Sequence, residues 1–283
     1  MVQRAVLVTG ASTGIGRATA LLLDAQGWTV FAGVRKRQDG EALAAAASGP
    51  LVPLMLDVTK PRQIEAAAKA IGERGIPLKG LVNNAGIASA APLEFVPIDD
   101  FRHQLEVNVV GQLAVIKAVL PLLRSAKGRI VNVTSIAGLI AGQMLGPYSA
   151  SKFALEALTH TLRQELAPWG IEAIAIEPGQ IATPIWSTSA ASADRMLGPV
   201  LPQVTSLYGR QLRAASRMAE RAARDGLPPE EVAKVIARAL TAKHPRTRYP
   251  VGTDAKLGAA LVARLPDRVR DRLLGGRRAA QGS

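Results

Sequence analysis

The stretch RAVLVTGASTGIG, residues 4–16, decides the fold. Its first part, residues 4–9, is a short apolar run that predicts a buried strand, and helical spacing of apolar residues starts at Ile15. Three glycines mark the junction: Gly10 and Gly14 lie between the two, and Gly16 follows Ile15. Glycines in such a turn let backbone N–H groups approach a diphosphate, and the N-terminus of the next helix adds partial positive charge. We therefore predict a dinucleotide site in this first strand–helix turn; a tight glycine-rich turn without a ligand is the alternative.

Strands and helices alternate along the chain that follows. The predicted strands are 28–34, 51–56, 79–83, 129–134, 171–176 and 248–251, and the predicted helices are 15–26, 41–47, 61–74, 98–125, 148–168, 203–224 and 229–242. Such alternation is typical of βαβ units. We predict an α/β fold: a Rossmann-type doubly wound parallel sheet of about seven strands with helices on both faces. The Ser-, Thr-, Ala- and Pro-rich segment 181–202 is predicted to be a loop.

Composition limits the classes to which the protein can belong. The 283 residues are 48% apolar but only 4% aromatic, which fits one large domain over residues 1–283. The absence of cysteine excludes disulfides and cysteine nucleophiles, and the three histidines have no metal-ligand spacing, so we predict no metal. No signal segment is evident, and no apolar stretch approaches the ~20 residues of a membrane span. We therefore expect a cytoplasmic protein.

The net charge of +13 is concentrated near the C-terminus. Residues 190–283 contain 18 Lys and Arg against 8 Asp and Glu, and residues 254–283 form a basic C-terminal extension. A basic segment can bind nucleic acid, anionic lipid or a phosphorylated ligand, or it can be a solvated surface. No aromatic residues interleave with the charges as a base-stacking surface would require. We therefore expect no nucleic-acid partner, and we favour docking of the extension on the domain over a place in an oligomer interface or contact with a membrane surface.

The end of the second predicted strand bears on the choice of cofactor. An NAD site has an acidic residue there that binds the ribose 2′-hydroxyl. Here Arg35, Lys36 and Arg37 follow the strand, and no carboxylate is present. Arginine suits bidentate binding of phosphate, so we predict NADP, with NAD bound through other contacts as the alternative.

Tyr148 and Lys152 lie four residues apart in a predicted helix, with Ser135 upstream. Residues at this spacing share a helix face, about 5–6 Å apart at Cβ. A fixed ammonium lowers the pKa of a phenol, which otherwise titrates near ~10, and the phenol can then exchange a proton with a carbonyl or alcohol oxygen. Most such pairs are surface neighbours, so the assignment depends on the rest of the chain.

Several motifs together resemble one family. They are TGASTGIG (9–16), Asp57, NNAG (83–86), Asn108, Ser135, YSASK (148–152) and PGQIAT (178–183). Their order and spacing resemble the short-chain dehydrogenase/reductase family over residues 4–185. The strings FAGVRK and RYPVGTDAK are similar to the branch of retinol, 17β-hydroxysteroid and 3-hydroxybutyrate dehydrogenases.

The resemblance implies four catalytic residues. Tyr148 is the implied general acid/base, Lys152 lowers its pKa and binds the nicotinamide ribose, and Ser135 holds the substrate oxygen. Asn108 is implied to position Lys152 through a water.

The resemblance also implies the cofactor contacts. Asp57 and Val58 would flank the adenine, residues 84–86 would line the adenine-ribose side, and residues 178–183 would contact the nicotinamide end. The expected contacts are Gly10, Ser12, Thr13, Gly14, Ile15, Gly16, Arg35, Lys36, Asp57, Val58, Asn84, Ala85, Gly86, Tyr148, Lys152, Pro178, Gly179, Ile181 and Thr183.

The segment 185–224 is expected to cover the substrate. Its apolar residues are Ile185, Trp186, Met196, Leu197, Val200, Leu201, Val204, Leu207 and Tyr208. Apolar walls suit a lipophilic alcohol or ketone, such as a sterol, a retinoid or a long-chain carbonyl compound. Ordinary packing on the core is the alternative for each of these residues.

The predicted function is hydride transfer between NADP(H) and such a small-molecule carbonyl or alcohol. The alternatives are an NADP-binding regulatory protein without turnover, an NAD-dependent alcohol dehydrogenase, and a basic nucleic-acid- or lipid-binding protein. Because family members are usually dimers or tetramers, the resemblance implies a homodimer or homotetramer.

Overall fold

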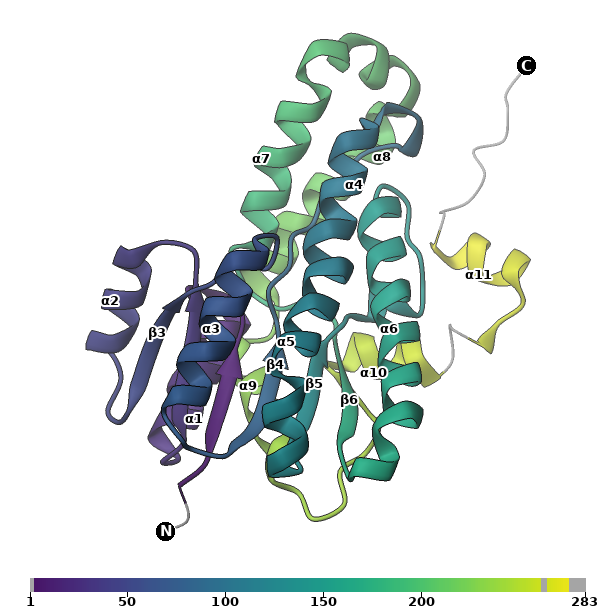
Figure 1. Cartoon of the computed structure of the whole chain (residues 1–283). Helices are drawn as coiled ribbons and strands as arrows, with labels where there is room; N and C mark the ends of the chain where they lie inside the picture. Colours follow the sequence, from purple (N-terminus) through teal and green to yellow (C-terminus); the bar gives the residue numbers. More distant parts are fainter. Residues whose placement is uncertain (1–2, 261–263, 275–283) are drawn as a thin grey trace.

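Seven parallel strands form one sheet in a computed structural model that describes residues 3–260 and 264–274. The strand order is β3-β2-β1-β4-β5-β6-β7. The strands are β1 (Ala5–Val8), β2 (Thr29–Val34), β3 (Leu51–Met55), β4 (Leu78–Asn83), β5 (Arg129–Val133), β6 (Glu172–Pro178) and β7 (Arg248–Val251). The chain order reverses between β1 and β4, so the crevice beyond the carboxyl ends of these strands is the expected ligand position (Figure 1). The predicted fold class is confirmed.

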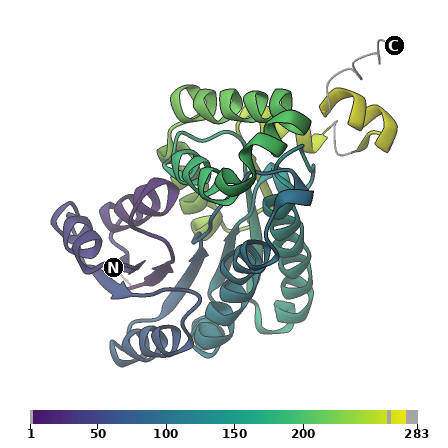
Figure 2. The ribbon, with the colours of Figure 1, turned by 90° about the horizontal axis from the view of Figure 1, so that it is seen from above.

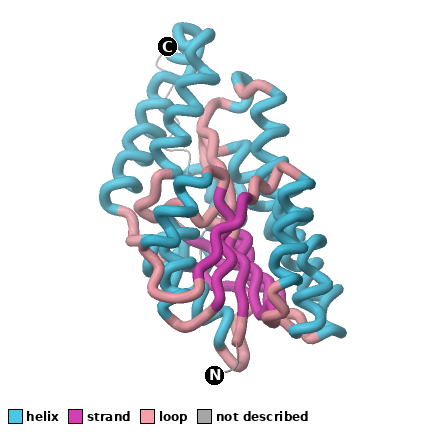
Figure 3. The backbone as a smooth tube through the Cα atoms, turned by 60° about the vertical axis from the view of Figure 1, so that its left-hand side comes forward, coloured by secondary structure: helices cyan, strands magenta, loops and turns pink. Residues whose placement is uncertain are grey.

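Helices cover both faces of the sheet (Figure 3). They are α1 (Gly14–Ala25), α2 (Arg37–Ala45), α3 (Pro61–Glu73), α4 (Ile98–Leu105), α5 (Gly111–Ala126), α6 (Gly146–Leu166), α7 (Ile185–Leu197), α8 (Leu201–Asp225), α9 (Pro229–Thr241), α10 (Thr253–Ala260) and α11 (Asp267–Leu274). Helix α1 packs against α9 on one face, and α3 packs against α5 on the other. Successive side chains of β1 point to opposite faces of the sheet, so this strand contributes to both cores. Val6 and Val8 belong to one apolar cluster, and Ala5 and Leu7 belong to the other.

The predicted loop over 181–202 is wrong, because most of it is helix α7. The hydroxyls of Ser187 and Thr188 donate to the carbonyl of Pro184 at 2.9 and 3.0 Å, so these residues bond within the helix. Met196 and Leu197, near the end of α7, are buried. Small and hydroxyl residues hid the helix because its middle, residues 187–195, has no large apolar side chain.

Helices α7 and α8 run alongside each other beyond the carboxyl ends of the strands (Figures 1 and 2). A separate apolar cluster anchors the pair to residues 91–96, and the Phe95 and Tyr208 rings meet edge to face with centroids 6.1 Å apart. The buried members of the cluster are Ala91, Met196, Leu197 and Val204. Several residues expected to line the substrate therefore pack inside the protein, whereas Leu201 and Leu207 are exposed.

The predicted helix 98–125 consists of α4, a π-helical turn (Glu106–Val110) and α5 in line. By length and composition alone, the combined segment Ile98–Ala126 is long and apolar enough to cross a membrane. The expectation that no apolar stretch approaches the length of a membrane span is therefore wrong. It packs against β4, α3 and α6 (Figure 1). Its apolar residues thus form much of one core of the sheet.

The basic C-terminal extension is only partly within the described residues, since 261–263 and 275–283 lie outside them. In the described part, Ala255 and Gly258 of α10 are buried. A Cβ at Gly258 would lie 2.9 Å from the Ile136 side chain. Helix α10 therefore docks beside the turn that follows β5.

Candidate active site

The glycine-rich turn leaves no space for side chains. Gly10 and Gly14 have left-handed backbone angles, with φ of +63° and +53°. A Cβ at Gly10 would lie 2.8 Å from the Cα of Ala85, and one at Gly16 would collide with the Gly10 carbonyl oxygen. Thr13 is the N-cap of α1, but its side chain makes no capping hydrogen bond. The first N–H groups of α1 are therefore not capped by this side chain and could bind an anion such as a diphosphate.

Thr9 and Asn84 hold this turn in place. The Thr9 hydroxyl accepts the N–H groups of Asn84 and Ala85, both at 3.0 Å. In return, the Asn84 amide donates to the carbonyls of Thr9 at 3.0 Å and Gly10 at 3.1 Å. The Asn84 side chain thus braces the loop, a role that the sequence did not indicate, and the Ile15 side chain packs into the core. Any cofactor contact by Ile15 would therefore come from its backbone.

Arg35 and Lys36 are exposed at the end of β2. Arg37 instead begins α2 and pairs with Glu41 at 3.0 Å, so two of the three predicted cations remain at the edge of the site. Burial would raise the pKa of Asp57, but hydrogen bonds from Thr59 and the nearby charge of Arg35 bring it below its ordinary value. Arg35 and Asp57 therefore lie close enough to interact.

Val58 is buried, and its carbonyl lies 2.6 Å from where a Cβ on Gly111 would be. The end of β3 and the start of α5 are thus in close backbone contact. The predicted adenine-flanking residues, Asp57 and Val58, thus follow β3 at the carboxyl edge of the sheet, with β2 between them and the strand that leads into the glycine turn.

Ser135 and Tyr148 come together after β5. Ser135 is buried, and its hydroxyl accepts the Ala137 N–H at 3.1 Å and approaches the Pro178 carbonyl at 3.4 Å. Burial raises the pKa of the Tyr148 phenol, and a hydrogen bond with Ser135 partly offsets that rise. Two hydroxyls from different elements are therefore directed at one position.

Lys152 lies one helical turn beyond Tyr148, as predicted, but its electrostatic effect differs from the prediction. Its ammonium donates to the Val133 carbonyl at 2.9 Å and stands 5.7 Å from the centroid of the Tyr148 ring. Because burial dominates, the pKa of Tyr148 is raised in this structure rather than lowered by Lys152. Burial also lowers the pKa of Lys152 to about 8.

Asn108 sits in the π-helical turn and links three segments. Its amide donates to the Ile87 carbonyl and to the Ser151 hydroxyl, both at 2.9 Å, and its oxygen accepts the Ile87 N–H at 2.9 Å. A Cβ on Gly86 would lie 3.3 Å from this oxygen and 3.8 Å from the Lys152 ammonium. The turn thus brings Asn108 within reach of Lys152. The sequence prediction treated residues 98–125 as regular helix and therefore missed this π-helical turn.

A buried charge network continues from Lys152 along α6. Glu156 lies one turn further on, and Arg248 of β7 pairs with it at 2.9 Å and also pairs with Glu177. Both carboxylates are at least 95% buried, and the negative charge of Glu156 opposes the burial effect on the pKa of Lys152. Sequence reasoning missed this network because its members are up to 92 positions apart from one another.

The loop after β6 closes over the glycine turn. A Cβ on Gly14 would lie 3.1 Å from the Thr183 side chain, so these two predicted contacts meet. Ile181 is buried, and the Asp254 carboxylate accepts the Gln180 N–H at 2.8 Å while filling the space above Gly179. Asp254, which follows β7, was not predicted because only the fold brings it to this loop.

Comparisons with known proteins agree with this geometry. A family model described as short chain dehydrogenase matches residues 4–194. The chain is 39% identical to mouse retinol dehydrogenase 5 over 95% of this chain and 87% of that protein. It is 34% identical to the NADPH-dependent 3-dehydrocapnine reductase of Ornithobacterium rhinotracheale over 96% of each chain. A short-chain dehydrogenase/reductase structure from Burkholderia phymatum in complex with NAD has a TM-score of 0.78 and 25% identity, over 96% of this chain and 95% of that one.

Proposed function

The chain belongs to the short-chain dehydrogenase family and is an NAD(P)-dependent oxidoreductase, and on that premise we propose that it transfers a hydride between NADP(H) and a carbonyl or alcohol carbon of a lipophilic substrate. The observation that carries this proposal is the convergence of Ser135, Tyr148 and Lys152 beside the loop that closes on the glycine turn. When bound, the nicotinamide supplies or accepts the hydride.

The protein's own groups handle the proton and the charge. In the reducing direction, the Ser135 hydroxyl holds the carbonyl oxygen, and Tyr148 gives its proton to that oxygen as the alcohol forms. The Lys152 ammonium stabilises the phenolate that remains. Asn108 and Ser151 fix the helix turn from which Tyr148 and Lys152 project. Oxidation of an alcohol runs the same steps in reverse.

Replacing Tyr148 tests this mechanism most directly. In Tyr148→Phe, we expect turnover at 340 nm with ketone and alcohol panels to fall about 10²–10⁴-fold, because the proton donor is lost. Thermal stability should be unchanged, and NADPH should still bind because the other expected cofactor contacts remain. Intact turnover would refute the proton transfer. Tight NADPH binding by the wild type with no turnover on any substrate would instead favour a nucleotide-binding regulator.

We infer that NADP is preferred because Arg35 and Lys36 remain exposed at the end of β2 without a carboxylate in that stretch. In Arg35→Ala/Lys36→Ala, loss of phosphate contacts should weaken NADPH binding about tenfold and leave NADH binding unchanged. A tenfold loss is at the low end of the effect expected when charge-assisted hydrogen bonds are removed. Arg37→Ala is the matched control, because Arg37 pairs with Glu41. Equal effects on NADPH and NADH would point to NAD as the cofactor.

We further propose a cytoplasmic homodimer or homotetramer in which the segment 185–224 covers the substrate. Support for assembly comes from Val110 and Phe153, which are 51% and 44% exposed on the outer face of the π-helical turn and α6. Light scattering gives the subunit number, and Phe153→Glu should lower it if this face pairs with a second copy.

A further inference from the structure

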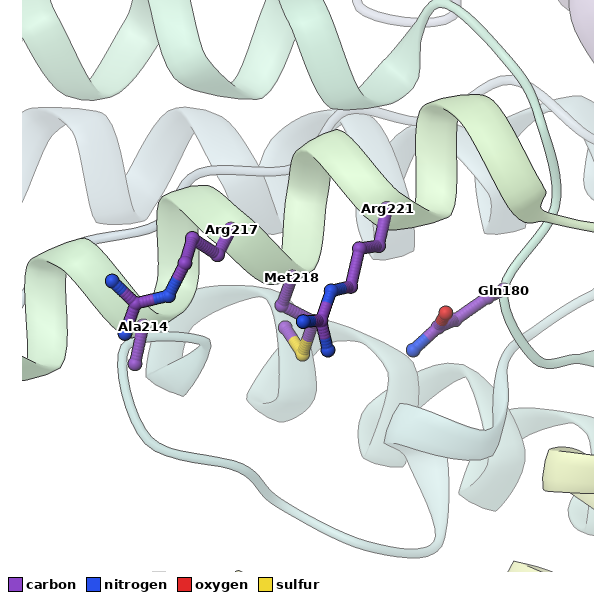
Figure 4. A pocket seen from close by; sticks show the side chains of 5 residues that line it. All are labelled: Gln180, Ala214, Arg217, Met218 and Arg221. Atoms are coloured by element: carbon purple, nitrogen blue, oxygen red, sulfur yellow. The ribbon is translucent and has the colours of Figure 1, made fainter.

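A cavity lies between α8 and the loop after β6, apart from the glycine turn. It has a volume of about 390 Å³ and is lined by Gln180, Ala214, Arg217, Met218 and Arg221. In Figure 4, Arg221 extends from α8 toward Gln180, and the Arg217 guanidinium lies at the end of the cavity marked by Ala214. This volume is at the lower end for ligand pockets, so it suits one part of a larger molecule.

The lining is cationic and has no acidic side chain. Arg217 and Arg221 are one helical turn apart and so share a face of α8. Within residues 3–260 and 264–274, no carboxylate lies within 4 Å of either guanidinium, whereas Arg224 pairs with Asp225 at 2.8 Å. Paired guanidinium groups suit the planar oxygens of a carboxylate, sulfonate or phosphate.

The same cavity has an apolar part. Ala214 and the 37% exposed side chain of Met218 lie among the charged groups. A methionine can adapt to an alkyl chain because it is flexible and polarizable. The lining therefore matches an anionic group attached to an apolar chain better than a bare ion.

The cavity lies near the candidate catalytic centre, on the evidence of the position of Gln180. This residue is two positions after Pro178, whose carbonyl lies 3.4 Å from the Ser135 hydroxyl. Helix α8 ends against the same loop, since a Cβ on Gly226 would lie 2.7 Å from the Ala182 nitrogen. The end of β2, where Arg35 lies, is separated from β6 by β1, β4 and β5, so this cavity is distinct from the proposed 2′-phosphate site.

We propose that this cavity binds an anionic group at the far end of an apolar substrate, with Arg217 and Arg221 holding a carboxylate, sulfonate or phosphate. The inference rests on the proposed function, because it assigns a substrate class to the same site. It narrows the class from lipophilic carbonyl compounds in general to anionic amphiphiles.

Binding of simple amphiphiles tests the site without turnover. Decanoate and decanesulfonate, with decanol as the neutral control, are titrated by calorimetry into the NADPH-saturated protein. In Arg217→Gln/Arg221→Gln, we expect both anions to bind about tenfold more weakly, with decanol unchanged. Arg210→Gln is the matched control, since Arg210 is an exposed arginine on the same helix but does not line the cavity. Unchanged decanoate binding in the double variant would overturn the proposal, and so would an equal loss in Arg210→Gln.

Turnover then separates the two proposals. A straight-chain methyl ketone is compared with the oxo acid of equal chain length that carries a carboxylate at its far end. The wild type should favour the oxo acid in kcat/KM by about tenfold, and the double variant should lose only this preference. If neither compound reacts but anion binding still depends on both arginines, the proposed reaction fails and the site stands. If both react equally in both proteins, the site fails and the reaction stands.

Discussion

The glycine turn (residues 9–16) and helix α8 both lie beyond the carboxyl ends of the strands, but they are held there in opposite ways. The turn is fixed by backbone atoms in contact and by the reciprocal hydrogen bonds of Thr9 and Asn84. Helix α8 buries only Val204, Gly209 and Ala222 among its 25 residues. Close backbone contacts in the turn exclude every residue larger than glycine at Gly10 and Gly16, so the turn could be recognised as a motif in the sequence. Most of α8 is free of that constraint, so its side chains can vary without disturbing the backbone around them.

A methyl group added to the glycine turn should have the largest effect on stability and on cofactor binding. In Gly16→Ala, the new Cβ would meet the Gly10 carbonyl and lie 2.5 Å from the Asn84 amide nitrogen, so the loop must move. We expect overpacking to cost about 1–3 kcal/mol in the free energy of unfolding. We also expect NADPH binding to be lost in a fluorescence titration. Gly198→Ala is the control, because its Cβ would meet nothing within 4 Å. NADPH binding equal to wild type would show that backbone contact does not constrain this turn.

The same contrast explains what could be predicted from the sequence. The strands follow from local apolar runs, and the glycine turn follows from its spacing. The roles predicted for Ser135, Tyr148 and Lys152 came from the motifs that resemble the family, since the four-residue spacing alone does not assign them. The bracing by Asn84, the docking of Asp254 and the Glu156–Arg248–Glu177 network depend on pairs far apart in the chain. No local pattern encodes such pairs. Helix α7 was missed for the opposite reason, since its local pattern is weak and its anchor is the distant segment 91–96.

Substitution of the buried residue Glu156 should have an effect of intermediate size, on the pH dependence of kcat. Burial lowers the pKa of Lys152 to about 8, and Glu156 limits that effect. If carbonyl reduction needs the ammonium, its rate should fall as the pH rises through about 8. In Glu156→Gln, one opposing charge is lost, so the falling limb of the kcat profile should move to lower pH.

The charges around Lys152 define the control for this experiment. Tyr148, Glu156 and His160 share its helix, and Arg248 and Glu177 join the network from β7 and β6. Glu172→Gln also removes a carboxylate paired with an arginine, but at the opposite end of β6. If the pH at which kcat falls is unchanged in Glu156→Gln, or shifts equally in both variants, the network does not control the pKa of Lys152.

A methyl group in α8 should have the smallest effect, in the reverse direction from Gly16→Ala. A Cβ on Gly209 would lie 3.4 Å from the Arg213 guanidinium and 3.5 Å from the Thr205 methyl group, both at ordinary contact distance. Alanine is favoured over glycine inside a helix by about 1 kcal/mol, so Gly209→Ala should raise the melting temperature by about 2–4 °C. Cofactor binding and kcat/KM should not change. Lost activity would mean that the α8 backbone needs a close approach at Gly209, by substrate or by a second subunit. The contrast between a backbone-defined cofactor turn and a side-chain-defined substrate helix would then have to be abandoned.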